Sequence, residues 1–217
     1  MDAWMRKHKV QTAIFTSKQN AERMQRRFPE MNILTITEGI TTSLYSAGRA
    51  LDERKIDLLE FGRSNRHVFK AALPQNIHHV CTRKDGKFIY SDKELFEAMC
   101  DTKVTIALPR NYTDPTIAGG VETLTQRYWE NMLSRIVMVG HAPRELVDLI
   151  GYNPVIEMDM KHASEQIVDV LTHIEDYQEL VDRNRETALQ CGDWNVRMKE
   201  VMSFLKQNGY ACESAGA

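Results

Sequence analysis

Two glutamates, Glu122 and Glu130, stand eight positions apart in the segment GGVETLTQRYWENML, residues 119–133. Apolar residues recur in this segment at helical spacing, which predicts one helix that carries both carboxylates. Eight helical residues advance about 12 Å, too far for an acid/base pair acting on one bond. At that spacing the carboxylates could instead accept hydrogen bonds from hydroxyl groups at two ends of one elongated ligand.

The entrance to the predicted helix suits an anion. Gly119 and Gly120 precede the expected first turn, and glycines let phosphate oxygens approach the backbone closely. The first amides of a helix have no partner inside it, and Thr123 adds a hydroxyl donor. A nucleotide-sugar, with its diphosphate at the helix start, fits this arrangement. The structural alternative is that Glu130 is solvated opposite the apolar stripe and that Glu122 only complements the helix dipole.

Short apolar runs alternate with helix-like stretches from residue 56 onward, which predicts parallel βαβ units. The predicted fold class is therefore α/β, a Rossmann-like parallel sheet with helices on both faces, followed by a helical C-terminal extension. The expected strands are IDLLEF, IHHVC, KVTIAL, RIVMVG and NPVIEM, and residues 161–208 read as helical. Before them we expect a strand at 10–16, a helix capped by Ser17, a strand NILTI and a connector at 41–55.

Ligands of open α/β sheets bind beyond the carboxyl ends of the strands. The segments expected there contribute Gly62 and Arg63 after the first strand, Arg110 after the third and His141 after the fourth. Arginine forks match phosphate geometry, so an anionic ligand is favoured. The alternative is that glycine and arginine are ordinary loop residues and that the histidine is a structural hydrogen-bonding group.

Charge, hydropathy and cysteine spacing limit the classes of partner and of metal or disulfide site that we expect. The formal net charge of −2 predicts no nucleic-acid partner. The apolar runs are far shorter than a membrane span, so we expect a cytoplasmic protein, with peripheral contact at the inner membrane face left open. No two of the four cysteines have CxxC spacing, which favours free thiols over a zinc site or a disulfide framework.

Several segments together resemble one family. ETLTQRYWE resembles the E-x7-E signature of GT-B-fold glycosyltransferases of the group 1 kind. IDLLEFGR resembles the first strand of that family's C-terminal domain, and TEGI resembles the segment before its linker. The stretches that follow Glu130, through RIVMVGHAPRELVDLIGYNPVIEMD to the closing helices, are also similar in order to the family.

The resemblance implies a division of the chain. Residues 1–54 would be a remnant of the N-terminal acceptor domain with a linker, 55–190 the nucleotide-sugar-binding domain, and 191–217 a C-terminal helix with a frayed tail. It implies donor transfer without a cofactor or a tightly bound metal. A separate acceptor-domain partner, or an N-terminal domain missing from this sequence, would then bind the acceptor.

The resemblance also implies roles for single residues. Glu122 would contact hydroxyls of the transferred sugar as the catalytic-site glutamate, and Glu130 would hold the ribose. Arg63, next to Gly62, would hold the diphosphate, with Arg66 or Lys70 as a second cation. The remaining expected donor contacts are Gly119, Gly120, Thr123, Arg110 and His141.

The expected function is transfer of a sugar from a UDP- or GDP-linked donor to a saccharide or lipid-linked acceptor, as in cell-surface polysaccharide synthesis. Two alternatives stay open. The chain could bind a nucleotide-sugar without turning it over, as a module or as a subunit of a split enzyme. It could also be a nucleotide-sugar epimerase with the same architecture.

Overall fold

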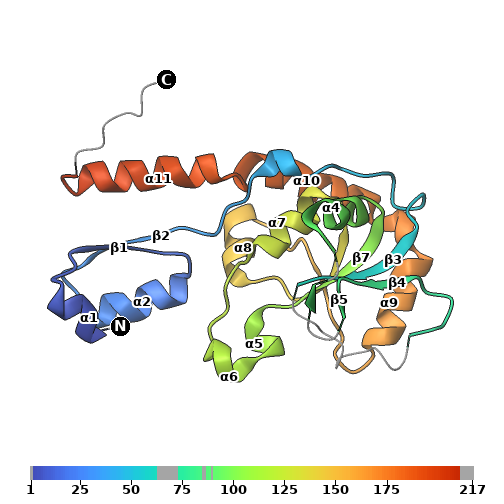
Figure 1. The fold of residues 1–217 in the computed structure, drawn as a ribbon, viewed down its shortest axis with the longest axis horizontal. Coiled ribbons are helices and arrows are strands. Elements are labelled where there is room, and N and C mark those ends of the chain that lie inside the picture. The colour runs from blue at the N-terminus through green and yellow to red at the C-terminus, as the bar shows by residue number, and fades with distance from the viewer. Residues whose placement is uncertain (1, 63–72, 85–86, 89, 211–217) are drawn as a thin grey trace.

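The computed structural model describes residues 2–62, 73–84, 87–88 and 90–210. The described residues form three sheets: a two-stranded one near the N-terminus, a five-stranded one in the larger part of the molecule, and a small two-stranded hairpin. Figure 1 shows the N-terminal strands apart from the larger sheet. The strands of the larger sheet run in the order β4-β3-β7-β8-β9, and all of its pairings are parallel. The predicted Rossmann-like parallel sheet is therefore confirmed.

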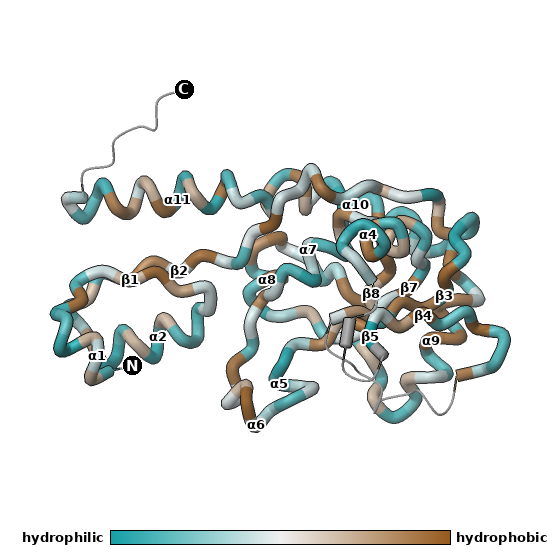
Figure 2. The backbone as a smooth tube through the Cα atoms, in the orientation of Figure 1, coloured by the Kyte–Doolittle hydropathy of each residue, from teal (hydrophilic) through white to brown (hydrophobic). Residues whose placement is uncertain are grey.

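The N-terminal unit is a short α-helix followed by a βαβ motif. It consists of α1 (Asp2–Lys7), β1 (Thr12–Phe15), α2 (Lys18–Arg27) and β2 (Asn32–Thr35). β1 and β2 pair in parallel, and Ser17 caps α2 by accepting a hydrogen bond from the Asn20 amide, as the sequence predicts. In Figure 2 the two strands are hydrophobic, whereas α2 is largely hydrophilic. The small core of this unit contains three buried methionines, Met5, Met24 and Met31.

The strands of the five-stranded sheet fall where the apolar runs predict them. Their bounds are β3 (Ile56–Glu60), β4 (His79–Cys81), β7 (Thr102–Ala107), β8 (Val137–Gly140) and β9 (Ile156–Glu157). Between them lie α4 (Asp92–Cys100), α7 (Gln126–Leu133) and α8 (Arg144–Ile150). After them come α9 (Ala163–Thr172), α10 (Gln178–Cys191) and α11 (Trp194–Gln207). This part also contains the 3-10 turns η1 (Thr42–Leu44) and η2 (Ile174–Tyr177).

Alternate residues of β8 show how helices cover both faces of the sheet. Val137 and Val139 belong to one buried cluster together with Ile167 of α9. Met138 points to the opposite face and belongs to a second cluster together with Trp129 of α7. Tyr128 and Trp129 are fully buried members of this second cluster.

The helix that carries Glu130 begins later than the sequence predicts. α7 starts at Gln126, after Thr125, so Glu122 lies in a non-helical segment four residues earlier. The amides of Glu122, Leu124 and Gln126 donate to side chains of other segments instead of entering helical hydrogen bonds. The expectation of two carboxylates on one helix is therefore wrong, and helix geometry no longer sets the distance between them.

Some short elements had no counterpart in the sequence reading. The stretch after β7, expected to be a loop, contains the one-turn helices α5 (Arg110–Thr113) and α6 (Pro115–Ala118). A small hairpin pairs β5 (Arg83–Lys84) with β6 (Lys87–Phe88). The expected helix HVFKAAL lies mostly outside the described residues.

The C-terminal helix returns to the N-terminal unit. α11 extends past the five-stranded sheet and runs alongside β1 and β2 (Figure 1). At its start, Ile40 forms an isolated bridge with Asp193. Beyond its end, Tyr210 donates through its hydroxyl to Thr12 Oγ1 at 2.9 Å. Most of the expected frayed tail, residues 211–217, lies outside the described residues.

Arg54 fixes the connector onto the five-stranded sheet. Its side chain is buried, and its guanidinium donates to the carbonyls of Ala47, Arg49 and Thr102 at 2.6–3.0 Å. Burial, and to a lesser extent the nearby Arg135, lowers the pKa of Arg54 to about 10. The three carbonyls lose their donor together if this side chain is replaced by an apolar one.

We expect Arg54→Met to lower the free energy of unfolding by about 2–4 kcal/mol, because buried acceptors are left unpaired. Urea denaturation followed by tryptophan fluorescence measures it. Arg49→Met is the matched control: that side chain is exposed, and a change below about 0.5 kcal/mol is expected. Equal effects of the two substitutions would contradict this account of Arg54.

Candidate functional site

The predicted ligand-binding edge of the sheet is formed by the segments that follow β3, β7 and β8. Gly62, Arg110 and His141 lie in these segments, as the sequence predicts. β7 and β8 approach each other closely at this edge. As a result, a Cβ added to Gly140 would overlap the carbonyl of Ala107. The His141 amide donates to that same carbonyl at 2.9 Å, which fixes the backbone of the turn.

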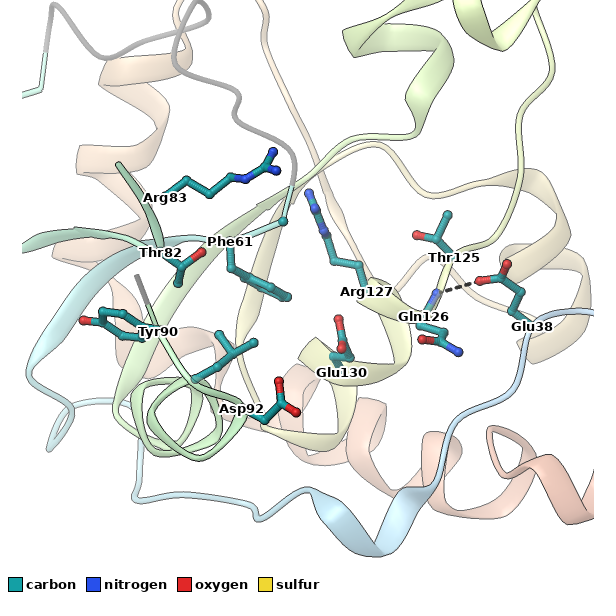
Figure 3. A pocket seen from close by; sticks show the side chains of 12 residues that line it. Glu38, Phe61, Thr82, Arg83, Tyr90, Asp92, Thr125, Gln126, Arg127 and Glu130 are labelled. Carbon is teal, nitrogen blue, oxygen red and sulfur yellow. Dashed lines mark hydrogen bonds between the residues drawn. The ribbon is translucent and has the colours of Figure 1, made fainter. Parts of the chain in front are cut away.

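A large cavity opens beside α7 (Figure 3). Its volume is about 720 Å³. Its walls come from Glu38 after β2, from the residues that follow β3 and β4, from the start of β5, and from α4 and α7 with the residues just before them. The lining residues are Glu38, Phe61, Gly62, Thr82, Arg83, Tyr90, Asp92, Leu95, Thr125, Gln126, Arg127 and Glu130. This set is called the large cavity below.

Glu130 contributes a desolvated carboxylate to the large cavity. Its Oε1 accepts a hydrogen bond of 3.0 Å from the Tyr45 hydroxyl. Burial raises the pKa of Glu130, although the Tyr45 hydrogen bond and the charge of Arg127 oppose that shift. Burial and the adjacent Glu130 in turn raise the pKa of Tyr45. The interpretation of Glu130 as a solvated surface glutamate is therefore wrong.

Arg127 and Arg83 place two guanidinium groups in the large cavity, and Figure 3 shows both extending into it. Arg127 lies over the ring of Phe61, 5.2 Å from its centroid. Gly62 has a φ of +73°, and a Cβ on it would overlap the Arg127 guanidinium. The bare glycine therefore makes room for this cation. Neither arginine is among the residues that the sequence predicts for the site, because both reach the cavity from segments other than the ends of the first, third and fourth strands.

Glu38 occupies the start of α7. Its carboxylate accepts from the Gln126 amide at 3.3 Å, and its carbonyl accepts from the Trp129 indole at 2.8 Å (Figure 3 shows the first bond). A carboxylate already complements the positive end of this helix. The prediction that ligand phosphates meet this helix start is therefore not supported by the geometry.

Glu122 lies on the other side of this segment, against α8. Its Oε1 accepts from the Arg144 amide at 2.6 Å, and its Oε2 lies 3.3 Å from His141 Nε2. His141 Nδ1 lies 2.7 Å from Glu157 Oε1, and the ring of Tyr112 stacks on the imidazole at 4.8 Å. A carboxylate at each ring nitrogen fixes the imidazole, which in turn orients Glu122.

Of the remaining expected contacts, Arg110 and Thr123 line a second hollow. A small cavity of about 310 Å³ is lined by Asn20, Arg23, Arg110, Ala118, Val121, Thr123 and Thr125. Gly119 and Gly120 have φ values of +59° and +72° and follow α6, which Gly119 terminates. They are not the entrance to α7, so the prediction of a glycine-lined helix start is wrong.

The structure thus separates the expected site residues into three groups. Gly62 and Glu130 line the large cavity, and Arg110 and Thr123 line the small cavity. Glu122 and His141 form a pair outside both. Thr125 lines both cavities, so they adjoin there. Arg63, Arg66 and Lys70 lie outside the described residues.

Other chemistry is sparse in the part of the chain that the structure describes. No group of three or more histidine, cysteine, aspartate or glutamate side chains there could hold a metal ion. Cys81, Cys100 and Cys191 are free thiols, as expected. Within the same residues, no helix has the length and apolar character needed to cross a membrane.

No protein-family model matches the chain, and no curated protein matches it in sequence. Solved structures of glycosyltransferases do match it in three dimensions. The crystal structure of TarM is similar over 91% of this chain and 44% of TarM, with a TM-score of 0.59 and 10% identity. Sucrose-phosphate synthase from Thermosynechococcus elongatus is similar over 91% of this chain and 59% of that protein, with a TM-score of 0.60 and 16% identity.

A third similar structure is the pneumococcal O-GlcNAc transferase GtfA in complex with UDP and GlcNAc. The similarity covers 96% of this chain and 47% of GtfA, with a TM-score of 0.52 and 12% identity. The chain therefore has the fold of GT-B-type glycosyltransferases, as the sequence resemblance implies. It spans between about two fifths and three fifths of the length of these three proteins.

The raised pKa of Glu130 has a measurable consequence. A carboxyl whose folded pKa is raised binds its proton more tightly when folded, so ionising it costs stability. That cost is complete above the raised pKa and disappears as the pH falls below the ordinary pKa. We expect Glu130→Gln to increase the free energy of unfolding at pH 7, with a gain that shrinks towards pH 4.

Urea denaturation at both pH values measures this difference. Glu186→Gln is the control, because that glutamate is exposed on α10 and should show little change at either pH. A Glu130→Gln protein that is less stable than the parent at pH 7 would contradict a desolvated, ionised carboxylate.

Proposed function

We propose that the chain is the donor-binding part of a glycosyltransferase that uses a UDP- or GDP-linked sugar. The observation that carries the proposal is the large cavity, where Glu130 and two guanidinium groups meet at the ligand-binding edge of a GT-B-type fold. Two of the structurally similar glycosyltransferases, GtfA and an alpha-glucosyltransferase, were solved with UDP.

The charges of the large cavity suit the parts of a nucleotide-sugar. A desolvated carboxylate accepts hydrogen bonds from vicinal hydroxyls, so Glu130 would hold the ribose. Arg83 and Arg127 would neutralise the diphosphate and stabilise the nucleoside diphosphate as a leaving group, the role that a metal ion fills elsewhere. Arg63, which follows Gly62, remains a proposed third cation.

The sugar would extend from the diphosphate towards Glu122. The oxygens of this carboxylate already meet the Arg144 amide and His141, but each carboxylate oxygen can accept more than one hydrogen bond. We propose that Glu122 accepts from sugar hydroxyls while His141, held by Glu157, keeps it in place. Gly119 and Gly120 would contribute backbone groups near the same end of the donor.

The acceptor is proposed to be a saccharide or a lipid-linked saccharide, as in cell-surface polysaccharide synthesis. The proposed location is the cytoplasm, with peripheral contact at the inner membrane face. These finer assignments come from the family resemblance, and the large cavity supports the donor alone. The expectation that no tightly bound metal is required is part of the same proposal.

A binding module or split-enzyme subunit is the second candidate. The chain spans about half of TarM and GtfA, and its N-terminal unit contributes a sheet of two strands. Acceptor-binding groups would then reside on another segment or polypeptide. Incubating the chain with radiolabelled UDP- and GDP-sugars separates the candidates: binding without turnover, restored to transfer by a second polypeptide, supports the subunit.

Calorimetric titration with UDP and with UDP-glucose tests the donor assignment; GDP and GDP-mannose serve if neither binds. Glu130→Ala should weaken binding of the nucleotide and of the nucleotide-sugar alike, by about tenfold or more, since one charge-assisted contact is worth about 1.5–3 kcal/mol. Nucleotide affinity that is unchanged in this variant would refute the assignment of Glu130.

Glu122→Ala should leave nucleotide affinity unchanged and weaken binding of the full nucleotide-sugar by about tenfold. Because Glu122 also accepts from the first amide of α8, Glu122→Gln is tested beside it to separate lost helix capping from lost sugar contact. Glu186→Ala is the shared control. Equal losses for nucleotide and nucleotide-sugar would rule out a sugar-specific role.

A further inference from the structure

The small cavity lies between the two parts of the molecule. Asn20 and Arg23 reach it from α2 of the N-terminal unit, whereas Arg110 and Thr123 reach it from segments beyond β7. It shares Thr125 with the large cavity and no other lining residue. A ligand in it would therefore adjoin a ligand of the large cavity at Thr125.

Two guanidinium groups from different parts of the fold converge on this hollow. Arg110 lies 3.6 Å from Asp114 in an exposed pair within one turn, which water screens strongly. Arg23 Nη2 lies 3.5 Å from the carbonyl of Gly119, at the outer limit of a hydrogen bond. Both contacts are weak, so a ligand anion could recruit both arginines at little cost.

The other polar groups of the small cavity also suit a phosphate. Thr123 and Thr125 supply hydroxyl donors, and Asn20 supplies an amide. Arginine forks bind phosphate oxygens in a bidentate manner, and hydroxyls complete the shell around a tetrahedral anion. No carboxylate lines this cavity, in contrast to the large cavity, which Glu38, Asp92 and Glu130 help to line.

We propose that the small cavity binds a phosphate group of the acceptor, so that the acceptor of this protein is a phosphate-bearing molecule. The proposal rests on the donor assignment of the large cavity, because that assignment makes the adjoining hollow the place for the second substrate. It changes the expected role of Arg110 and Thr123 from donor contacts to acceptor contacts. It also gives the N-terminal unit a direct part in the site, through Arg23.

The probe is sn-glycerol 3-phosphate, with glycerol as the uncharged comparison. Both are titrated into the isotopically labelled full chain and followed by amide NMR, first alone and then with saturating UDP. We expect the phosphate ester to shift amides of residues 118–125 and of α2, with UDP present or absent. Glycerol should leave these amides unshifted.

The double substitution Arg23→Gln with Arg110→Gln should raise the dissociation constant of the phosphate ester at least tenfold. Arg26→Gln is the matched control, since Arg26 is exposed on the same helix but does not line the cavity. Both substituted arginines are exposed, so the fold should persist, and dispersed amide spectra verify this. If the pair does not fold, the two single variants are compared with Arg26→Gln in the same way.

Three results would overturn the proposal. The phosphate ester could bind equally well to the double variant, shift none of these amides, or be displaced by UDP. Displacement by UDP would assign both arginines to the donor diphosphate instead. If UDP and GDP themselves do not bind, the donor assignment fails separately, while the response of the double variant still decides whether the small cavity binds phosphate.

Discussion

Three backbone amides, two in the segment before α7 and one at the first residue of α7, donate to side chains that come from three other parts of the chain. Glu122 donates to Gln19 of α2, Leu124 to Glu145 of α8, and Gln126 to Glu38, which follows β2. A helix that began at residue 121 would pair the Gln126 amide with the Glu122 carbonyl, so the bond from Gln126 to Glu38 marks a later helix start. Much of the candidate site follows from this one extended segment.

The carboxylate of Glu145 links that segment to the N-terminal unit. One oxygen accepts from the Leu124 amide, and the other accepts at 2.6 Å from the amide of Lys18 in the first turn of α2. The negative charge complements the positive end of α2. Because the segment is extended, Thr123 and Thr125 line the small cavity while Glu122 meets His141 and α8. Two chemically different surfaces therefore arise from five consecutive residues.

Most of the fold could be predicted from the sequence because it depends on local patterns. Apolar runs located the five strands, and Ser17 located the start of α2. The error at Glu122 has a different origin: the residues of 121–125 are compatible with a helix, and the side chains that hold this segment in its non-helical form are Gln19, Glu38 and Glu145. Their contacts with this segment span 21 to 103 positions, a distance that no local pattern encodes.

The candidate site was predicted in part for the same reason. The strand ends expected from the sequence correctly predicted that Gly62, Arg110 and His141 lie at one edge of the sheet, because parallel strands share a direction. Nothing local indicates that Gly62 makes room for Arg127, since that contact joins the end of β3 to α7. The burial of Glu130 likewise depends on Tyr45, which comes from the distant connector.

The contact between Tyr210 and Thr12 has a consequence for how the chain is made. These residues are 198 positions apart, so at ordinary rates of about 5–20 residues per second the ribosome adds the later one some 10–40 s after the earlier one. During that interval β1 and β2 emerge without the C-terminal segment that later lies beside them, and the backbone edges of a two-stranded sheet invite intermolecular pairing. The hydrophilic α2 and the short strands of this unit would limit such aggregation on the ribosome until α11 arrives.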